Sequence, residues 1–563
     1  MTRFKRWHRL TICALAAAAL YLPGLGAPAL WEPDEGRYAE IAREMVQSAD
    51  YATPRNDWVR YFEKPPLMYW ATAGSIAALG TNEFAVRLPA AIFSAAEVAL
   101  TCAIGEAMFG AAVGMLAAMA LALSPIVFGF ARFLTLDPAL AFFVTAALGS
   151  FYAAAGSSDL GSGPGRRWLI GSSAMVAFGT LSKGPVALVL CGAVALIFMV
   201  AERRWHDLKR VPWMACAMVY LAITAPWFVI VARRNPEFLR YFFVHEHIQR
   251  YLAGTEHGWG PWFFVAIAAA GTWPWFYFVP LGVGELRREA AGEPDRYRSA
   301  LRFLSIWFLT ILVFFSIPRS KLGSYILPAI PALAIPAGYG IERLRQLDSR
   351  HANRIWAGFA VANAALAVAL TIALISIRDR VGTILVVDGV TIAACLALAG
   401  IACYIAARGG RVTAAVAIIA IGVVAAAGMA IKARGDAAPM GSYRRLASAA
   451  RPYLHSGCVL ASYAHQVHSI PFYTATREAM VDYLGELGAL RDDPDARGSF
   501  LTSAELATLW GSSSCVVLIA NQKDRRRLSR ILRVKPAVIA CEGKKLALFN
   551  RPVDRPAQSY DCR

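Results

Sequence analysis

Long apolar runs recur along most of this chain, separated by short polar stretches. A helix needs roughly 17–25 apolar residues to cross a lipid bilayer. Runs of this kind occur at 9–29, 83–105, 108–130, 133–155, 212–232, 260–284, 300–317, 324–342, 355–376, 383–406 and 411–432. Residues 168–201 add two more if 181–185 form a turn at the membrane surface. The pattern therefore predicts an all-α polytopic membrane protein with about thirteen transmembrane helices.

The polar stretches between the runs give the predicted topology. If the basic N-terminus lies in the cytoplasm, the basic stretches 165–168, 202–210, 285–302, 341–354 and 407–411 lie there too, which agrees with the excess of Lys and Arg in cytoplasmic loops. A net charge of +19 is then a property of these loops and does not indicate nucleic-acid binding. The first segment could instead be a secretory signal cleaved at 27–29. The next segment would still enter the membrane from outside, so the predicted topology is the same.

The chain divides into three parts under this topology. A long outer loop covers 31–82 and is expected to form short amphipathic helices. This loop is part of the predicted transmembrane domain, which covers 1–435. The tail, 439–563, changes to shorter alternating patterns and lies outside the cytoplasm. Residues 458–463, 515–520 and 546–550 read as strands, whereas 502–510 and 524–532 read as helices. The tail is therefore predicted to be a small α/β domain.

The cysteines follow the same division. Six lie in apolar segments and read as small packing residues, whereas Cys458, Cys515, Cys541 and Cys562 lie in the outer tail. An even number in an oxidising compartment indicates two disulfides, whose connectivity the sequence leaves open. No spacing in the tail resembles a zinc site, and 179–185 lack the glycine pattern of a phosphate-binding loop, so ATP is not the implied energy source.

The outer loop carries an unusual concentration of polar side chains. If a helix begins near Pro33, then Asp34, Arg37, Tyr38 and Ile41 share one face. A carboxylate, a guanidinium and a phenol would point the same way. The alternative is an amphipathic helix on the membrane surface with a solvated charged face.

More polar residues lie in the loop and at the predicted outer ends of helices. Two prolines follow Glu63 and Lys64 and stiffen that segment, although its aromatic neighbours are also typical of an interfacial anchor. Each residue alone is typical of a helix cap or a snorkelling side chain, but ionisable groups gathered on one side of a membrane indicate a site. The further members are Tyr61, Asp137, Lys183, His245, His247, Arg319, Lys321 and Tyr325.

Carboxylates beside fixed cations favour chemistry at a phosphate. A phosphate leaving group develops negative charge that cations stabilise, and a carboxylate such as Asp34 or Asp137 can act as a base or orient the attacking group. Outside the cytoplasm no nucleotide activates a sugar, so a lipid phosphate is the natural carrier. The residues therefore point to transfer of a sugar from a polyprenyl phosphate.

Five motifs in this order resemble the membrane glycosyltransferases of the GT-C fold: "EPDEGRYAEIAREM", "YFEKPPLMYW", "TLDP", "LSKGP" and "SKLGSYILP". The resemblance spans roughly 9–435 and is strongest to the bacterial lipid A aminoarabinose transferases, with protein O-mannosyltransferases as broader relatives. It implies a multi-pass protein of the bacterial inner membrane. Its donor would be undecaprenyl phosphate carrying 4-amino-4-deoxy-L-arabinose, and its acceptor a lipid A phosphate at the periplasmic face. The expected outcome is polymyxin resistance.

The resemblance also implies roles for individual residues. Asp34, Asp137 and Lys64 would belong to the reaction centre, and the donor and its phosphate would be bound by Arg37, Tyr38, Tyr61, Lys183, Arg319, Lys321 and Tyr325. No cofactor is required. A divalent ion held by Glu63 with His245 and His247 is a weaker candidate, because histidines two residues apart do not share a helix face.

Two alternatives stay open at this point. A related transferase could move another sugar to a different lipid or protein, since the motifs around Asp34 and Lys64 are shared by such enzymes. A lipid or solute transporter would also have many helices, but it would be expected to have related halves or helices broken near the membrane centre. Direct displacement at the anomeric carbon, without an enzyme nucleophile, predicts inversion of configuration.

Overall fold

The structure of the chain is a computed structural model that describes residues 2–157, 159–243, 258–292, 294–491, 493–532, 535–553 and 558–560. Its contacts divide the chain into two compact units. The first, here called the helical unit, comprises Met1–Leu25, Glu63–Met68 and Arg87–Ala433. The second, called the sheet unit, comprises Gly26–Phe62, Tyr69–Val86 and Arg434–Arg563, so it combines most of the first loop with the tail.

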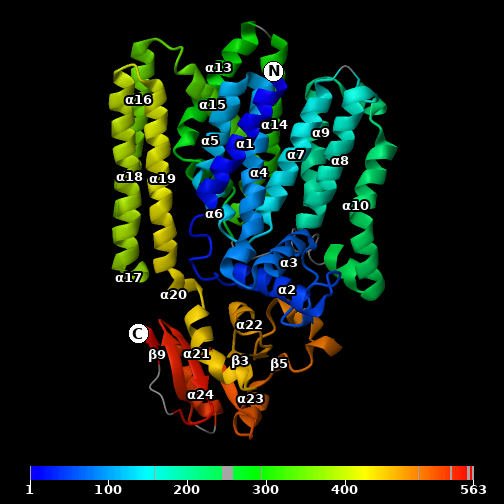
Figure 1. Ribbon diagram of the computed structural model, residues 1–563, viewed down its shortest axis with the longest axis vertical. Helices are drawn as coiled ribbons and strands as arrows, with labels where there is room; N and C mark the ends of the chain where they lie inside the picture. Colours follow the sequence, from blue (N-terminus) through cyan, green and yellow to red (C-terminus); the bar gives the residue numbers. More distant parts are fainter. Residues whose placement is uncertain are drawn as a thin grey trace. The chain divides into compact units, whose positions relative to one another are not determined.

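Helices make up the helical unit, and Figure 1 shows the long ones running alongside one another. They are α1 (Thr2–Tyr21), α4 (Glu83–Phe109), α5 (Ala111–Ala122), α6 (Pro125–Ala131), α7 (Asp137–Ala155), α8 (Gly163–Lys183), α9 (Val186–Ala201), α10 (Trp213–Arg234), α12 (Phe263–Gly271), α13 (Val279–Gly292), α14 (Pro294–Ser316), α15 (Pro331–Arg343), α16 (Ser349–Ser376), α17 (Arg378–Val381), α18 (Thr383–Arg408) and α19 (Val412–Asp436). Short 3-10 turns η1 (Trp205–Arg210), η3 (Trp275–Phe278) and η4 (Gly323–Ala329) join some of them.

In the described part of the chain, seven helices are long and apolar enough to cross a membrane, and the number rises to 10 if each of three bent pairs is one span. The bends are 63° between α5 and α6, 100° between α12 and the segment from Trp275, and 58° between η4 and α15. A proline stands at each break, namely Pro125, Pro274 and Pro331, and proline removes a helical hydrogen bond. The sequence predicts 108–130, 260–284 and 324–342 as continuous spans, whereas the structure breaks each one. The total of thirteen stays a prediction.

The core of the helical unit forms where these helices pack together. Three fully buried tryptophans, Trp275, Trp307 and Trp356, are among its largest side chains. The α7 helix is the most buried of the seven long helices, and it packs against α8, α9 and η4. Its first residue, Asp137, contacts Lys183, so the start of α7 lies beside the end of α8.

The loop part of the sheet unit begins with α2 (Asp34–Ser48), a hairpin of β1 (Arg55–Asn56) and β2 (Val59–Arg60), and α3 (Leu67–Leu79). The predicted helix start after Pro33 is confirmed. Every residue from Glu35 to Met45 is buried, including three glutamates and two arginines. The alternative of an amphipathic helix with a solvated charged face is therefore wrong, because these charged side chains are buried, and Glu35, Arg37, Glu40 and Arg43 form ion pairs.

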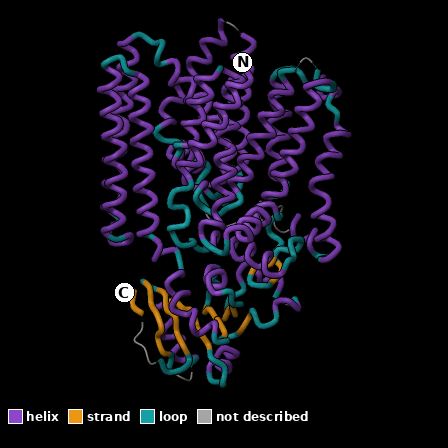
Figure 2. Tube along the Cα trace, in the orientation of Figure 1, coloured by secondary structure: helices purple, strands orange, loops and turns teal. Residues whose placement is uncertain are grey.

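The tail folds into a seven-stranded mixed sheet, drawn in orange in Figure 2. Its strands lie in the order β5 (Phe500–Leu501), β4 (Glu478–Val481), β3 (Val459–Tyr463), β6 (Val516–Asn521), β8 (Lys545–Phe549), β7 (Ala537–Glu542) and β9 (Gln558–Tyr560). The pairs β5–β4, β4–β3, β3–β6 and β7–β9 are parallel, while β6–β8 and β8–β7 are antiparallel. The three predicted strands are β3, β6 and β8, so the predicted α/β character of the tail is confirmed.

Helices cover both faces of this sheet. On one face α21 (Arg444–His455) packs against Val517 and Ile519, and on the other α23 (Ser503–Trp510) and α24 (Arg525–Ile531) pack against Leu518. The alternation along β6 follows from the two-residue period of a strand. Shorter elements complete the unit: α20 (Ala438–Gly441), α22 (Ser469–Thr474), η5 (Gly485–Leu490), η6 (Pro494–Ala496) and η7 (Gln522–Asp524). The two predicted tail helices are α23 and α24.

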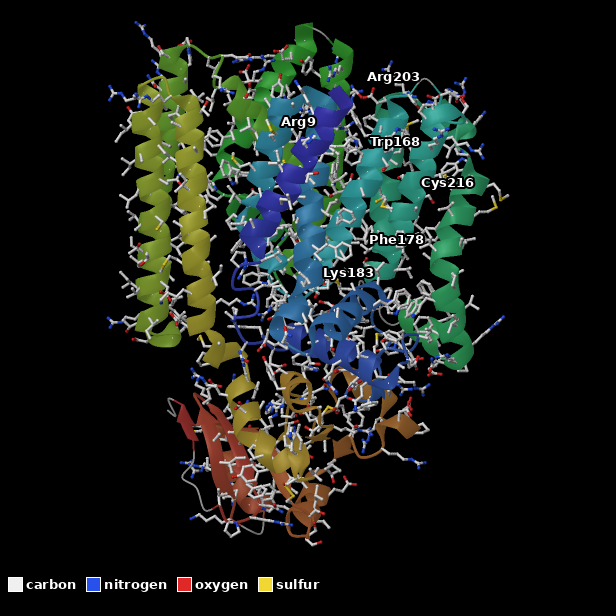
Figure 3. All side chains as sticks on the ribbon, viewed as in Figure 1. Arg9, Trp168, Phe178, Lys183, Arg203 and Cys216 are labelled. Atoms are coloured by element: carbon white, nitrogen blue, oxygen red, sulfur yellow. A yellow bond between two sulfur atoms is a disulfide. The ribbon has the colours of Figure 1, made fainter. Side chains whose placement is uncertain are left out.

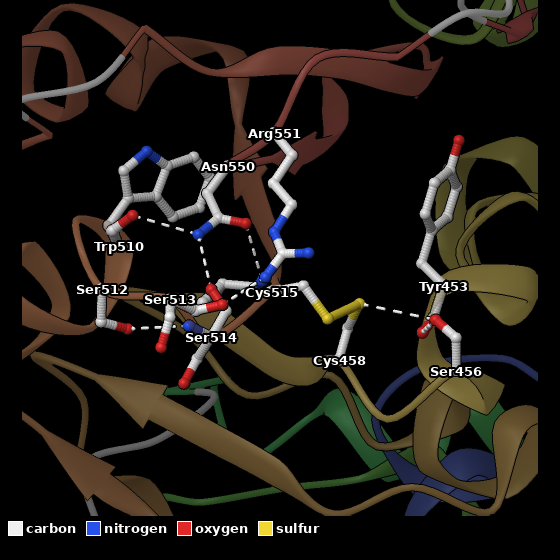
Figure 4. The surroundings of a disulfide bond; sticks show 11 residues. Tyr453, Ser456, Cys458, Trp510, Ser512, Ser513, Ser514, Cys515, Asn550 and Arg551 are labelled. Atoms are coloured by element: carbon white, nitrogen blue, oxygen red, sulfur yellow. Dashed lines mark hydrogen bonds between the residues drawn. A yellow bond between two sulfur atoms is a disulfide. The ribbon is translucent and has the colours of Figure 1, made fainter.

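A disulfide joins Cys458 and Cys515 at the start of two adjacent parallel strands (Figure 4). The register pairs Val459 with Val516, which brings the preceding cysteines to a Cα–Cα distance of 4.7 Å. Asn550 fixes the same corner, since its amide donates to the carbonyls of Trp510 and Ser514 and its oxygen accepts from the Val516 N–H. Cys541 is also disulfide-bonded, and Cys562 lies outside the described residues.

Candidate active site

An ion pair between a buried aspartate and a partly buried lysine joins the ends of two helices in the helical unit. Asp137 is the first residue of α7, Lys183 is the last residue of α8, and the Lys183 ammonium donates to an Asp137 carboxylate oxygen. Each charge suits the helix end that it occupies, since a helix dipole favours an anion at its N-terminus and a cation at its C-terminus. Gly184 follows with a φ of 94°, a conformation that favours glycine and ends α8 after the lysine.

Tyr325 of η4 completes this group, called the Asp137–Lys183–Tyr325 cluster below. The Lys183 Nζ lies 4.3 Å from the centre of the Tyr325 ring, which is a cation–π contact. The ring of Phe315 lies 5.2 Å from the same ring, and Trp307 donates a hydrogen bond of 2.8 Å to the Pro328 carbonyl within η4. Buried aromatic packing therefore holds the phenol beside the ammonium.

The cluster lies at one end of the helical unit. In Figure 3, Trp168, Phe178 and Lys183 mark successive positions along α8, and Arg9 and Arg203 lie toward the other end of this unit. The predicted topology requires this separation, because it puts the basic stretches on the cytoplasmic side and Lys183 on the outer side. The ammonium and the phenol can donate to phosphate oxygens and stabilise negative charge that develops there, while the carboxylate holds the ammonium in place.

Glu63 and Lys64 form a second pair in the helical unit. The Lys64 Nζ lies 3.8 Å from a Glu63 carboxylate oxygen and donates to the Glu63 carbonyl at 3.2 Å. Glu63 is buried, whereas Lys64 is partly exposed. Since the following Pro65 and Pro66 restrict the backbone, the pair is held in place as the sequence predicts.

Lys321 and Arg319 have different surroundings from the cluster residues. Lys321 is buried and its ammonium donates to the carbonyls of Trp259 and Pro318, so it holds the turn before η4. Arg319 is exposed. The predicted contact of these two side chains with a donor phosphate stays a prediction.

In the sheet unit, Arg37 gathers the predicted residues of α2. Its guanidinium forms ion pairs with Asp34, one helical turn earlier, and with Glu486 of η5. It also lies 5.0 Å from the centre of the Tyr38 ring, and Tyr61 is close enough to interact with its charge. The predicted shared face of Asp34, Arg37 and Tyr38 is therefore present, and Tyr61 joins it.

Sequence reasoning did not find Glu486 or His468, both from the tail. Glu486 stands between a glycine and a leucine in a stretch without a recognisable motif. Burial, together with the Arg37 charge, lowers the pKa of His468 well below its usual value. The sequence signal available was indirect, because the five N–H donors of Arg37 leave room for partners beyond Asp34. No local pattern identifies which distant residue supplies the second one.

Glu32 is a titrating group of the sheet unit. Its carboxylate accepts hydrogen bonds from the Ser469 N–H at 2.6 Å and the His468 N–H at 3.3 Å. Burial raises its pKa to about 7, although these hydrogen bonds lower it. A raised carboxyl pKa adds stability that is complete below the ordinary value near 4.5 and is lost as pH rises toward 7. His468 acts in the opposite direction, because a lowered histidine pKa adds stability that is lost as pH falls below about 6.5.

The wild type is expected to lose stability between pH 5 and 7 as Glu32 loses its proton. The Glu32→Gln variant cannot titrate at this position and should not show that loss. The difference in local unfolding free energy between wild type and variant should change by up to about 1.4 kcal/mol per pH unit. Hydrogen exchange of α22 in the full chain, followed against pH, measures it. Equal slopes for the two proteins would contradict the assignment of this proton to Glu32.

The predicted metal site is not tested. His245 and His247 lie outside the described residues, and Glu63 is paired with Lys64. Among the residues that the structure describes, no group of three or more His, Cys, Asp or Glu side chains has an arrangement that could hold a metal ion.

Comparisons with known proteins agree with the motif reading. The family model "Dolichyl-phosphate-mannose-protein mannosyltransferase" matches residues 63–230. An undecaprenyl phosphate-alpha-4-amino-4-deoxy-L-arabinose arabinosyl transferase of Pseudomonas paraeruginosa is 33% identical over 355 residues, which cover 62% of each chain. The enzyme of that name from Yersinia pestis is 32% identical over 326 residues, covering 58% of this chain and 57% of the relative. The chain thus spans about three fifths of the length of the curated relatives it matches.

A solved structure extends the likeness to nearly the whole chain. The crystal structure of ArnT from Cupriavidus metallidurans bound to undecaprenyl phosphate superposes with a TM-score of 0.84 and 27% identity, and the match covers 96% of this chain and 98% of that one. The resemblance to membrane glycosyltransferases of the GT-C fold, and among them to the aminoarabinose transferases, is confirmed.

Proposed function

Because the chain is similar to the aminoarabinose transferases in sequence and in fold, we propose that it transfers 4-amino-4-deoxy-L-arabinose from undecaprenyl phosphate to lipid A phosphates. The observation that carries the proposal is the Asp137–Lys183–Tyr325 cluster in a chain that superposes on a structure named as bound to undecaprenyl phosphate. Lipid A so modified loses negative charge, and the host becomes resistant to polymyxin and other cationic peptides.

The proposal includes a location in the bacterial inner membrane, with the cluster and the tail on the periplasmic side. The basic stretches of the chain support this orientation, because Lys and Arg are enriched in cytoplasmic loops. The Cys458–Cys515 disulfide supports it independently, since disulfides form and persist in the periplasm and are rare in the cytoplasm.

The proposed mechanism is a single displacement at the anomeric carbon. As the bond from this carbon to the donor phosphate breaks, negative charge grows on the phosphate oxygen, and Lys183 stabilises it. Asp137 accepts a hydrogen bond from the Lys183 ammonium and so orients it, and Tyr325 packs against the ammonium. The acceptor oxygen attacks from the opposite face, which inverts the configuration and needs no enzyme nucleophile.

Asp34 orients the acceptor or stabilises the cationic character of the sugar in this proposal. A lipid A phosphate is already ionised near neutral pH, so no proton has to be removed from it. A hydroxyl acceptor, in contrast, requires a general base, whose loss costs about 100-fold to 10,000-fold in rate.

The Asp34→Asn variant separates these two chemistries. With a phosphate acceptor we expect a partial loss of activity, about tenfold or less, because the amide keeps the size of the side chain and can still accept from Arg37. Initial rates of transfer to purified lipid A by the full-length variant measure it, with Glu486→Gln as the matched change at the other carboxylate of Arg37. A loss of 1,000-fold or more at Asp34 alone would instead assign a general base and a hydroxyl acceptor.

Mass spectrometry of lipid A tests the proposed function directly. The chain is expressed in a host that lacks its own transferase but still makes the donor. A mass increase matching aminoarabinose on lipid A phosphates, with polymyxin resistance, is the expected result. Unchanged lipid A from cells in which the chain is correctly inserted would overturn the proposed sugar and acceptor.

A related transferase with another sugar or acceptor is the second candidate, and the match of residues 63–230 to a mannosyltransferase family favours it. Identifying the sugar lipid that co-purifies with the chain from its native membrane separates the two. A lipid or solute transporter would instead move an intact donor or lipid across vesicles without forming a new glycosidic bond.

A further inference from the structure

A pocket of about 720 Å³ lies within the sheet unit, and none of the predicted catalytic or donor-binding residues lines it. Its walls come from three segments: the end of α2, the stretch from the end of α3 to Glu83, and the helices α21 and α22. Small-molecule sites in proteins usually have volumes of about 300–1,000 Å³. The pocket is therefore large enough for a head group or a phosphorylated sugar.

One face of α21 supplies most of the charge in this pocket. Arg444, Ser448, Arg451 and His455 recur every three or four residues and so line up along the helix. The opposite face, with Leu446, Ala450 and Leu454, is buried against the sheet. Since the core fixes how the helix is rotated, the cationic face is fixed as well.

The arginines of the pocket differ in how far they are already paired. Arg43 of α2 forms an ion pair with Glu40, and Arg444 lies 3.1 Å from Glu83. Within the described part of the sheet unit, Arg451 has no ion-pair partner and its side chain is exposed. Arg43 and Arg444 are each matched by a carboxylate, so Arg451 carries the excess positive charge of the pocket.

Neutral polar groups and an apolar floor accompany these cations. Asn82, Tyr473 and Thr474 line the pocket but already donate hydrogen bonds within the protein, and the buried side chains of Ala447 and Phe472 form part of the lining, so the arginines are the donors left for a ligand. Arginine binds phosphate oxygens through two parallel N–H bonds, which is the most specific recognition that this set of donors offers.

We propose that this pocket binds a phosphate group, with Arg451 and Arg444 as its principal ligands. Two sources share this chemistry: the head group of an anionic phospholipid and a free phosphate or phosphorylated sugar. The site is additional to the donor and acceptor phosphates of the proposed reaction, and its occupancy does not depend on the identity of the transferred sugar.

Hydrogen exchange of the full chain in nanodiscs tests the proposal. Protection of α21 and of residues 472–475 is compared in phosphatidylcholine alone, with phosphatidylglycerol included, and with inorganic phosphate added to phosphatidylcholine. If exchange slows only in the nanodiscs that include phosphatidylglycerol, the ligand is a lipid head group. If exchange slows when inorganic phosphate is added, the ligand is soluble. Unchanged exchange in both arms overturns the proposal.

Two charge-matched double variants assign the effect to the pocket. Arg444→Gln with Arg451→Gln is expected to weaken binding of the effective probe by about 100-fold, tenfold for each charged hydrogen-bonding partner. Arg526→Gln with Arg530→Gln removes the same charge from exposed positions of α24 and should leave binding unchanged. An equal loss of binding in both double variants would show that binding depends only on net charge, and it would overturn the proposed site. If the first variant is unfolded, Arg451→Gln alone serves, with an expected tenfold loss.

Discussion

Replacing Lys183 with alanine is expected to reduce sugar transfer by about 100-fold or more while the protein stays folded. The variant removes the cation proposed to stabilise the departing phosphate, and loss of one preorganised group of this kind costs about 100-fold to 1,000-fold in rate. It also leaves the buried Asp137 without the ammonium that now donates to it. Single-turnover transfer from undecaprenyl phosphate-linked sugar, measured with the purified full chain, gives the rate.

Three further variants show whether the charge or the packing is responsible. Arg166→Ala removes an exposed cation from the same helix and should leave the rate unchanged. Lys183→Arg keeps the charge and should recover part of the activity. Asp137→Asn should lower the rate less than Lys183→Ala, because it leaves the ammonium in place. Wild-type rates for Lys183→Ala, with the protein correctly folded, would exclude the cluster from the reaction.

Replacing both Cys458 and Cys515 with serine is expected to destabilise the sheet unit by about 4 kcal/mol. The disulfide closes a loop with a sequence separation of 57, and the entropy removed from the unfolded chain by a loop of this size corresponds to roughly that value. Hydrogen exchange of β3 and β6 in the full chain measures the local free energy of opening, which is the appropriate quantity for a multi-domain protein.

A free cysteine provides the control for this measurement. Cys216→Ser changes a half-buried, unbonded cysteine of α10 and should leave the exchange of β3 and β6 unaffected. Asn550 also ties this corner together through three hydrogen bonds. If the double serine variant exchanges at the wild-type rate, these hydrogen bonds alone hold the ends of the two strands.

The hydrophobic pattern by itself determined where the helices and the clearest strands lie. Apolar runs long enough to cross a bilayer can form only helices, so they identify the helical unit, and the alternating segments of the tail became β3, β6 and β8. The helix after Pro33, with Asp34, Arg37 and Tyr38 on one face, also follows from local rules, since spacing along a helix fixes which side chains are neighbours.

Only the tertiary structure decided which distant residues meet. Asp137 and Lys183 are 46 residues apart, Arg37 and Glu486 are 449 apart, and the pairing of Cys458 with Cys515 depends on the register of β3 against β6. Likewise, local charge suggested a solvated face for α2, whereas packing buried that face and supplied partners from the tail. The physical reason is that the hydrophobic periodicity of a segment shows only which of its sides is buried and which is exposed. Contacts between segments depend on how the helices and strands pack, and the same pattern is compatible with many packings.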